Sequence, residues 1–548
     1  MAACGVDTIM ATSSPQHSDS ASLWRPLRTP TFRNLLLADV VSDIGTFMQS
    51  VGAAWMMVSL GAGPLYVALT QTASSLPFFI LALPAGSVGD IVDRRRLVLF
   101  TEAWMIVVAI VLAAATLAGV MTPWLLLLLT FALSAGDAFE TPTWRAILPE
   151  VVHKDDLASA SALNGIEFNF ARAVGPALAG VIVAAAGVGA AFVVNAVSFI
   201  GVIVVVARWK RPVHTRTTPP ETVAGATVAA IRFVRFSPGM RGVMFRSGVV
   251  MFFASALLAL LPSVARQVSE AATGYGVLLG CFGVGAVVGA LAMQPARERW
   301  STETVASGGV AIVGAATMVT GFVHSLPGLS LLMLVAGGAW IVFISLANSL
   351  IQRLAPDWVR ARVLAVFLLL FQGGLAAGSV VWGMVAVRFG IETALLWAGL
   401  GTIATTALGL VAALPDTSPD VSPWIHLKMP TFVSAGEPGP GEGPVLVVIE
   451  YDVEAGKETG FIEAMHRYGR VRRRDGASRW GVFRDLERAN RFVETFVVGS
   501  WAEHLRQHER STLDDQELER RLRVYVRGTP SVRHLVYATP RPHHPHRS

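Results

Sequence analysis

Charge is scarce in this sequence, and that scarcity excludes most classes of soluble protein. Of its 548 residues only 15% are Asp, Glu, Lys or Arg, whereas 53% are hydrophobic and the mean hydropathy is +0.54. An average soluble domain carries roughly 25% charged residues. The two cysteines lie far apart, Cys4 in a polar tail and Cys281 in an apolar run, so a disulfide-held scaffold is excluded as well.

Two kinds of sequence element are also absent. No Gly-x-x-x-x-Gly-Lys phosphate-binding sequence occurs, so direct use of ATP is not expected. Residues 1–29 contain no apolar run long enough for a signal peptide, and we interpret them as a cytoplasmic N-terminal tail. His504 and His508 have metal-binding spacing but no evident third ligand, so we expect a surface pair and neither a metal nor a cofactor.

What the sequence does contain is a succession of long apolar runs. A helix needs about 20 apolar residues to cross a bilayer, and the many glycines allow such helices to pack closely. We predict an all-α polytopic membrane protein with twelve transmembrane helices, followed by a small α+β domain. The expected spans are 33–60, 65–92, 97–118, 123–147, 159–186, 190–208, 243–265, 274–295, 304–323, 327–352, 361–387 and 391–414.

The loops between these runs alternate between basic and uncharged, with Arg266 and Arg388 as the exceptions. Arg94, Arg95 and Arg96 lie in one kind of loop, whereas the loops at 61–64 and 119–123 contain neither Lys nor Arg. Lys and Arg favour the cytoplasmic side of a membrane. We therefore expect a multi-pass protein of the cytoplasmic (inner) membrane with both termini in the cytoplasm. The net charge of +6 is then a topology signal, and no nucleic-acid partner is expected.

The two sets of six runs resemble each other weakly. Gly86 precedes Arg94 by eight residues, and Gly289 precedes Arg297 by the same interval. A six-plus-six repeat is a common plan among transporters, which bind substrate between the halves. The expected divisions are an N-terminal half (30–208), a cytoplasmic connector (209–242) with an amphipathic segment at 224–236, a C-terminal half (243–414), a linker (415–443), a cytoplasmic α+β domain (444–540) and a disordered tail (541–548).

The loop between the second and third runs contains Gly86-Ser-Val-Gly-Asp90-Ile-Val-Asp-Arg94-Arg95. It resembles the signature loop Gly-x-x-x-Asp-Arg-x-Gly-Arg-Arg of the major facilitator superfamily, which it matches at Gly86, Asp90, Arg94 and Arg95 and departs from at two positions. The resemblance implies a charge-paired gate that holds the two halves closed and breaks when they rock apart. The alternative is that the arginines only anchor the loop to anionic lipid.

Three further stretches, which begin at Asn169, Asn195 and Gln352, resemble one exporter branch of that superfamily. Its members are called transmembrane secretion effectors and include the enterobactin exporter and macrolide efflux proteins. The likeness covers residues 30–414. It implies a transporter, not an enzyme, that exports a small amphiphilic molecule such as a drug, a macrolide or a siderophore.

After the linker, strand-like and helix-like patterns alternate, which is typical of a small α+β domain. The order of elements is similar to the ferredoxin-like, antibiotic-biosynthesis-monooxygenase type, and a tail of this kind occurs on many members of the exporter branch. Strands are expected at 445–451, 479–483 and 532–538, and helices at 457–474, 487–498 and 513–526.

Two acidic residues lie inside the first apolar run. Asp39 and Asp43 are four positions apart and therefore on one face of a helix. Each ionised carboxylate near the bilayer centre costs about 2.5–3.5 kcal/mol, so such residues are expected to have a function. We interpret the pair as a proton or cation site. The alternative is that Asp39 reaches the membrane interface and only Asp43 is buried.

Further charged residues fall in the fourth and fifth runs. Arg172 is expected to pair with the carboxylate of Asp43 or of Glu167, and Asp137 is another candidate for the proton or substrate pathway. Many drug–proton antiporters of the superfamily carry an Arg in span four, which residues 124–131 lack. Arg172 is the residue that would substitute for it.

The fifth run also contains Gly175, Pro176 and Gly180, which match the antiporter-type motif of the superfamily. Together with the resemblance, this motif predicts alternating access driven by proton antiport. The expected partners are a small-molecule substrate, protons and the lipid bilayer, with dimerisation through the C-terminal domain left open. The alternative function is a membrane-anchored protein whose C-terminal domain is an enzyme or a dimerising regulatory module.

Overall fold

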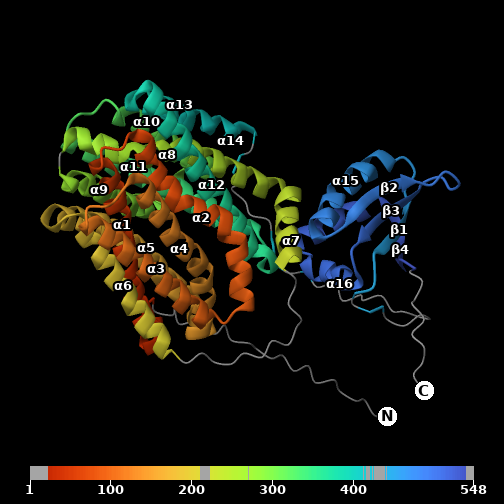
Figure 1. Cartoon of the computed structure of the whole chain (residues 1–548). Coiled ribbons are helices and arrows are strands. Elements are labelled where there is room, and N and C mark those ends of the chain that lie inside the picture. Colours follow the sequence, from red (N-terminus) through yellow and green to blue (C-terminus); the bar gives the residue numbers. More distant parts are fainter. Residues whose placement is uncertain are drawn as a thin grey trace, which may run out of the picture.

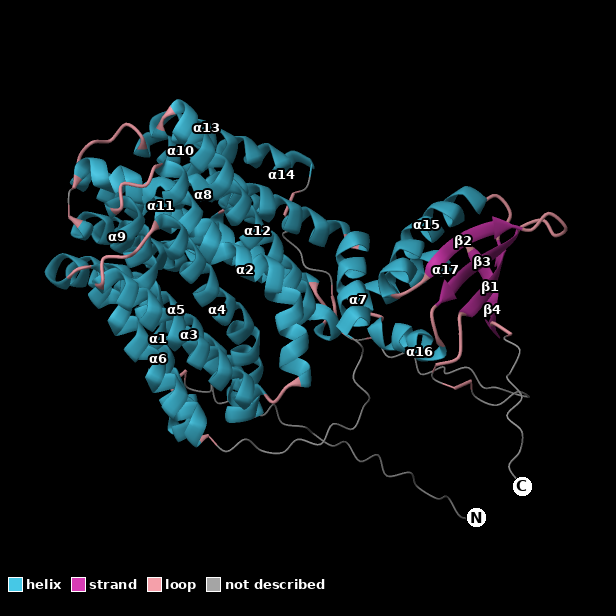
Figure 2. Cartoon of the chain, in the orientation of Figure 1, coloured by secondary structure: helices cyan, strands magenta, loops and turns pink. Residues whose placement is uncertain are grey.

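The computed structural model consists of a large helical bundle and a small α+β domain that lies against one end of it (Figure 1 and Figure 2). The structure describes residues 23–209, 223–269, 271–411, 413–414, 420–422, 424, 438–439 and 441–538. Most of the predicted N-terminal tail, linker and C-terminal tail lies outside these residues.

The first six long helices form a group that we term the N half. Three of them, α1, α2 and α4, begin with a proline, whose fixed φ and missing N–H suit a first helical turn. α5 and α6 meet at Gly187, where a φ of +80° favours glycine. The N half contains α1 (Pro30–Ser59), α2 (Pro64–Ile91), α3 (Arg94–Leu117), α4 (Pro123–Val151), α5 (Leu157–Ala186) and α6 (Val188–Arg208), with short 3-10 turns η1 (Arg25–Arg28) and η2 (Lys154–Asp156).

A second group of long helices, termed the C half, follows a shorter helix, α7 (Val223–Phe236), which begins at the predicted amphipathic segment. The two halves meet along two seams, where α2 packs on α12 and α5 packs on α9. The C half contains α8 (Pro238–Val268), α9 (Ala272–Arg299), α10 (Thr302–Thr320), α11 (Leu326–Leu354), α12 (Asp357–Phe389) and α13 (Ile391–Ala404), and the chain continues into η3 (Thr405–Ala407) and α14 (Leu408–Val411).

The number of membrane helices follows from length and apolarity. Eleven helices among the described residues are long and apolar enough to cross a membrane. α1 is the twelfth long helix of the bundle; it carries Asp39 and Asp43 and packs along α5 and α6. The prediction of a twelve-helix polytopic fold is confirmed.

Glycines set the distance between several helix pairs. A Cβ atom added to Gly337 of α11 would lie 1.9 Å from the carbonyl oxygen of Phe282 in α9. The reverse contact is equally close, because a Cβ on Gly285 of α9 would lie 1.9 Å from the carbonyl oxygen of Leu334. The backbones of α9 and α11 can come this close only because glycine, which has no side chain, stands at both contact positions.

A buried ion pair fixes the end of the C half near α7. Arg246 of α8 is 1% exposed, and its guanidinium donates to both carboxylate oxygens of Glu303 in α10, at 2.8 and 2.7 Å. The same carboxylate accepts a hydrogen bond from the backbone N–H of Leu414, at 2.9 Å. Glu303 therefore holds the chain where it leaves the last helices of the bundle.

The C-terminal domain is a four-stranded antiparallel sheet in the order β2-β3-β1-β4, with helices on one face (Figure 2). Along the chain the elements follow the order βαββαβ if α16 and α17 are counted as one helical unit. This order and the strand arrangement are those of the predicted ferredoxin-like fold. The elements are β1 (Val445–Val453), α15 (Glu458–Asp475), β2 (Ser478–Arg484), β3 (Arg491–Val498), α16 (Trp501–Arg510), α17 (Leu513–Arg523) and β4 (Val526–Val536).

One predicted helix is wrong. Residues 487–498 were expected to be helical, but Arg491–Val498 forms strand β3 at the centre of the sheet, between β1 and β2. Phe492, Phe496 and Val498 alternate with partly exposed residues, so they all point into the core. This period of two, together with β-branched residues, favours a strand; the polar residues before it concealed the pattern.

The interior of this domain also contains polar groups. Glu494 of β3 is fully buried and accepts hydrogen bonds from the Tyr451 hydroxyl at 2.9 Å and from Trp480 Nε1 at 2.8 Å. His504 is only 2% exposed and its Nε2 lies 3.4 Å from Nε2 of His508. The expectation of a surface histidine pair is therefore wrong for His504, because α16 turns this side chain towards the sheet.

The first prediction concerns helix packing. Gly337→Ala places a methyl group against the α9 backbone, so α9 and α11 must separate, and we expect a loss of about 2 kcal/mol or more of stability. Thermal unfolding of the purified protein in detergent measures this. Gly308→Ala in α10 is the control, because a Cβ there meets nothing within 4 Å. Equal melting temperatures for the two variants would contradict the packing.

The second prediction concerns pH. Burial, with smaller contributions from His508 and His534, lowers the pKa of His504 from 6.5 to about 3. The unfolded chain therefore binds a proton that the folded domain does not, and stability falls as the pH drops below 6.5. The expected loss is about 3 kcal/mol between pH 7 and pH 4.

Hydrogen exchange of the C-terminal domain amides in the full chain measures this loss. His504→Asn is expected to flatten the pH dependence, and the exposed His466→Asn is expected to leave it unchanged. An unchanged slope in His504→Asn would contradict the assignment.

Candidate functional site

Six carboxyl groups gather in the interior of the N half. Asp43 of α1 and Glu167 of α5 lie within hydrogen-bonding reach of each other, and so do Glu102 of α3 and Glu140 of α4. Asp137 is close enough to both pairs to interact with them electrostatically. The last member, Asp39, interacts with the carboxyls of both pairs.

Further polar contacts of this carboxyl cluster come from α3 and α4. Thr101 donates to Glu140 at 3.2 Å, and Thr141 donates to Asp137 at 3.2 Å. Asp39 shares a hydrogen bond with the side chain of Trp144. Two carboxyl groups can share a hydrogen bond only when one of them holds a proton. The geometry of the two carboxyl pairs is therefore that of a site able to bind and release protons.

The structure brings together four of the acidic residues singled out from the sequence, namely Asp39, Asp43, Asp137 and Glu167. Helical spacing explains the pair on α1, which occupies one helical face. Glu102 was missed, although it is 1% exposed and central to the cluster. A signal was present in the sequence, because a lone acidic residue inside an apolar run is by itself a functional-site hypothesis.

The position of Arg172 differs from the prediction. Among the described residues it forms no ion pair with Asp43 or Glu167; its guanidinium lies over the ring of Phe282 in α9, 5.8 Å from the ring centre. A cation over an aromatic face is favourable. Arg172 therefore extends from the N half towards the C half, and the carboxyl cluster has no cation paired with it from this residue.

The small residues of α5 bring three helices together. A Cβ on Gly175 would lie 2.6 Å from Cβ of Phe47 in α1, and one on Gly180 would lie 3.1 Å from Cα of Gly276 in α9. Pro176 is buried between them, and its carbonyl oxygen also faces Gly276. The motif thus places α5 against α1, which carries the carboxyl pair, and against α9 of the other half.

The loop between α2 and α3 is held by arginines. Arg94 forms an ion pair with Glu150 of α4 at 2.7 Å and donates to the carbonyl of Ala146 at 2.8 Å. Arg95 donates to the last carbonyls of α6, to Val206 at 3.0 Å and to Ala207. Free carbonyls at a helix end need such donors. Gly86 and Asp90 belong to the last turns of α2, and the side chain of Asp90 lies outside the described part of the chain.

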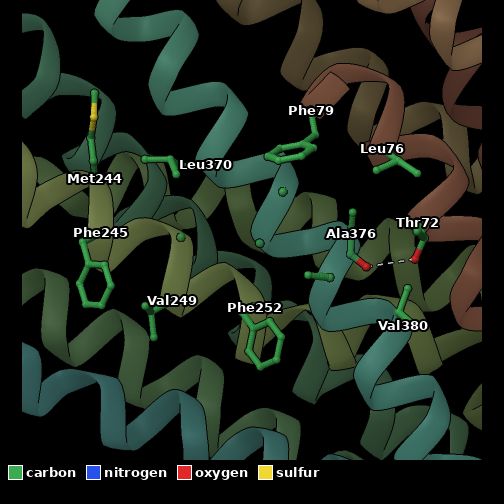
Figure 3. A pocket seen from close by; sticks show the side chains of 14 residues that line it. Thr72, Leu76, Phe79, Met244, Phe245, Val249, Phe252, Leu370, Ala376 and Val380 are labelled. Carbon is green, nitrogen blue, oxygen red and sulfur yellow. Dashed lines mark hydrogen bonds between the residues drawn. The ribbon is translucent and has the colours of Figure 1, made fainter. Parts of the chain in front are cut away.

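An apolar cavity of about 600 Å³ lies on the seam between α2 and α12, with α8 as its third wall (Figure 3). Phe79 and Leu76 from α2 face Leu370 and Val380 from α12. The polar contact drawn across it is the hydrogen bond from the Thr72 hydroxyl to the carbonyl of Ala376, at 3.1 Å. This volume falls within the usual range for sites that hold drug-sized molecules.

Comparison with solved structures identifies the architecture. The chain is similar to a bacterial homologue of the human lysosomal transporter Spinster in its inward-facing conformation, with a TM-score of 0.56 and 14% identity over 71% of this chain and 96% of the other. It is also similar to the nucleoside transporter NupG, with a TM-score of 0.55 and 11% identity over 70% and 98% of the two chains. At these identities the likeness shows the fold alone.

Sequence relatives indicate the kind of protein. The chain is 23% identical to the staphyloferrin A transporter of Staphylococcus aureus over 66% of this chain and 91% of that protein. It is 24% identical to the multidrug efflux pump Tap of Mycolicibacterium fortuitum over 69% and 94%. It is 25% identical to the enterobactin exporter EntS of Salmonella typhi over 48% and 63%. All three relatives are transporters.

The family model for transmembrane secretion effectors matches residues 21–542, which is nearly the whole chain. This match agrees with the twelve-helix fold, the two seams between the halves and the signature loop described above. The chain therefore belongs to the transmembrane secretion effectors, an efflux branch of the major facilitator superfamily.

Proposed function

We propose that this protein exports a small amphiphilic molecule, namely a drug, a macrolide or a siderophore, by alternating access coupled to proton antiport. The observation that carries the proposal is the contact between Asp43 and Glu167. Carboxyls on two different helices of one half lie within hydrogen-bonding reach, and a hydrogen bond between them needs a proton on one of the two groups. The relatives, a staphyloferrin A transporter, a multidrug efflux pump and an enterobactin exporter, support the substrate class.

The carboxyl cluster supports coupling because it links the helices that would move. Loss of the shared proton leaves like charges side by side inside a low-dielectric bundle, where repulsion is strong. Helices α1 and α5 would then favour an arrangement that separates the carboxyls or exposes them to water. Because Gly180 packs α5 directly on α9, such a shift is transmitted to the C half.

The seam cavity supports an amphiphilic cargo. Its walls come from both halves, so its shape depends on how the halves are tilted relative to each other. An apolar group placed there would be held by Phe79 of α2 and Phe252 of α8. A substrate bound at a seam of this kind is released when the halves rock, which is the behaviour expected of transporters built from repeats.

The arginine-rich loop supports an orientation in the cytoplasmic membrane. Arg94 and Arg95 begin α3, and Arg360 lies in the first turn of α12. The loops at 61–64 and 119–123 have no basic residue, and Arg266 and Arg388 are the exceptions at the opposite helix ends. We propose that the starts of α3 and α12 and both termini lie in the cytoplasm. In the same proposal, Arg94 and its ion pair with Glu150 form part of the inner gate.

The third prediction tests the proton site. We express the chain in cells that lack their own exporters and measure accumulation of a panel of dyes, macrolides and siderophores, with and without a protonophore. Export by the unchanged chain is expected to stop when the protonophore is added. Asp43→Asn is expected to show none of this export even without the protonophore, because an amide cannot release a proton. Asp43→Glu retains a carboxyl and is expected to export.

Two controls separate a coupling defect from a folding defect. Glu392→Gln, at the start of α13 and outside the carboxyl cluster, is expected to export normally. The melting temperature of purified Asp43→Asn is expected to match that of the unchanged protein or exceed it, since a buried charge site has been removed. Protonophore-sensitive export by Asp43→Asn at the normal rate would contradict the assignment.

We propose a second role for the C-terminal domain. It forms a dimer through the face of its sheet that no helix covers. Helices cover the other face (Figure 2). On the open face, Phe483 of β2 and Leu535 of β4 remain 59% and 50% exposed. Leu446 of β1 and Val497 of β3 are paired across the two central strands, which lie between β2 and β4. Large apolar residues gathered on one exposed face are typical of an interaction surface.

The fourth prediction tests this second role. Light scattering of the full chain in detergent is expected to give a dimer, and the double variant Phe483→Glu with Leu535→Glu is expected to give a monomer. Leu486→Glu, which changes a residue already 89% exposed in the loop after β2, serves as the matched control. A monomer for the unchanged protein would overturn the dimer.

A further inference from the structure

Helix α7 is packed firmly on the C half. It ends at Phe236, and α8 begins at Pro238, so the two helices are separated by a single residue. Ala229, Ala230 and Phe233 are at most 2% exposed. The ring of Phe233 contacts that of Trp358, at the start of α12, edge to face with the ring centres 6.0 Å apart. α7 thus belongs to the C half and marks one end of it.

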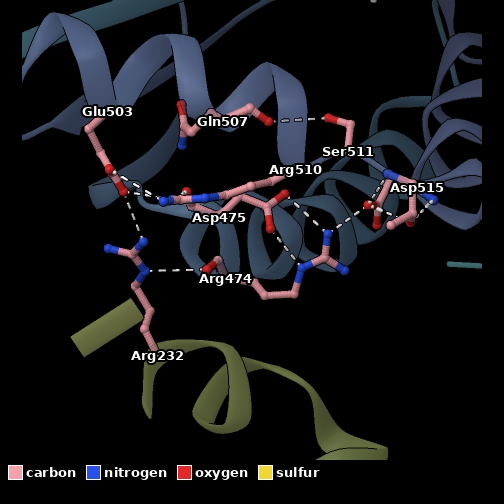
Figure 4. Close-up of polar contacts among 9 residues, drawn as sticks. Arg232, Arg474, Asp475, Glu503, Gln507, Arg510, Ser511 and Asp515 are labelled. Atoms are coloured by element: carbon pink, nitrogen blue, oxygen red, sulfur yellow. Dashed lines mark hydrogen bonds and ion pairs between the residues drawn. The ribbon is translucent and has the colours of Figure 1, made fainter. Parts of the chain in front are cut away.

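The opposite side of α7 contacts the C-terminal domain. Arg232 donates from Nη2 to the carboxylate of Glu503 in α16 at 3.1 Å, and from Nε to the backbone carbonyl of Arg474 in α15 at 3.3 Å (Figure 4). The residues joined by the ion pair are 271 positions apart in the chain. α7 is therefore held between the membrane helices and the C-terminal domain.

Two arginines of the domain reach past α7 to aromatic rings of the C half. The guanidinium of Arg510 lies over the ring of Trp358 at 4.5 Å, and that of Arg474 lies over the ring of Phe233 at 5.6 Å. Attraction between a cation and an aromatic face is directional. These stacked pairs therefore fix the orientation of the domain as well as its distance.

Acidic groups of the domain hold those arginines in place. Arg510 is 4% exposed and donates to Glu503 at 2.6 Å and to the backbone carbonyl of Asp475 at 2.8 Å. Arg474 is bound by Asp475 at 2.8 Å and by Asp515, the third residue of α17, at 2.6 Å (Figure 4). Each guanidinium is thus fixed by its own domain before it meets the C half, which lowers the entropic cost of docking.

The charge on Glu503 is stabilised by the same contacts. Burial acts to raise its pKa, but hydrogen bonds from Arg510, Arg506 and Arg232 outweigh burial and hold the pKa below its usual value. Arg232 of α7 is one of these donors, so the carboxylate is best satisfied when the domain is docked. Separation would leave Arg232 without its carboxylate partner and would expose Phe233 and Trp358.

We propose that the C-terminal domain is docked rigidly on the C half through α7 and moves with it as one body, and that this docking positions the start of α12 for transport. The surface of the domain that contacts α7 is formed by α15 and α16. α12 forms one wall of the seam cavity, so a displaced Trp358 would alter the helix that contacts the substrate. The transport part of this inference depends on the proposed export function, whereas the docking part does not.

The experiment measures docking by distances between spin labels. In a chain with Cys4→Ser and Cys281→Ser, labels are attached at Leu486→Cys in the domain and at Glu298→Cys on the C half. A second pair combines Leu486→Cys with Arg96→Cys on the N half. We expect a narrow distance distribution for the C-half pair and a broader one for the N-half pair, because the halves rock relative to each other.

The docking variant is Arg232→Ala with Glu503→Gln. It is expected to broaden the C-half distribution and to lower the initial rate of export in the dye, macrolide and siderophore panel by about fivefold. Arg232→Lys keeps the charge and is expected to retain docking and most of the rate. Glu517→Gln, which removes an exposed ion pair with Arg520 away from α7, is the matched control and is expected to change neither readout.

The outcomes separate the two proposals. A C-half distribution as broad as the N-half one in the unchanged chain would overturn the rigid docking. Broadening without any change in export rate would overturn the role of docking in transport. Absence of export by the unchanged chain would count against the proposed export function, while the label distances would still decide whether the domain is docked.

Discussion

The structure depends on one constraint, which is that carboxyl groups buried among membrane helices must be satisfied by their own protein. No water in the bilayer core can replace a missing partner. Here the partners are other carboxyls, as with Asp43 and Glu167, and hydroxyls, as with Thr101 and Glu140. A hydrogen bond between two carboxyls needs a proton on one of them, whereas the threonine hydroxyl donates to its carboxylate in either state. In the proposed mechanism, the carboxyl pairs therefore make the interior of the N half respond to protonation.

Close backbone packing converts this local sensitivity into a property of the whole bundle. α5 carries Glu167 on the side of α1 and Gly180 on the side of α9, so one helix joins the carboxyl cluster to the other half. Beyond the bundle, α7 joins the C half to the C-terminal domain through Arg232. The interface between α5 and α9 is formed by glycine contacts, and the interface between α7 and the C-terminal domain is formed by fixed guanidinium groups. Neither kind of contact deforms gradually.

The sequence could predict what is local and could not predict what joins distant segments. Twelve apolar runs of sufficient length indicated the helices, and two aspartates four residues apart indicated one polar face. Glu102 was missed although it is an acid inside an apolar run, as Asp137 is, and β3 was missed because polar residues precede it. The ion pair of Arg232 with Glu503 could not be predicted, since nothing in either segment specifies a partner 271 positions away.

The central claim is that outward movement of substrate is exchanged for inward movement of protons through the carboxyl cluster. The most direct measurement is the internal pH of liposomes that contain the purified protein, recorded as a substrate found in the cell panel is added at no initial pH gradient. The account predicts a proton flux opposite to the substrate flux, absent in Asp43→Asn. Substrate movement with no accompanying proton flux in the unchanged protein would contradict it.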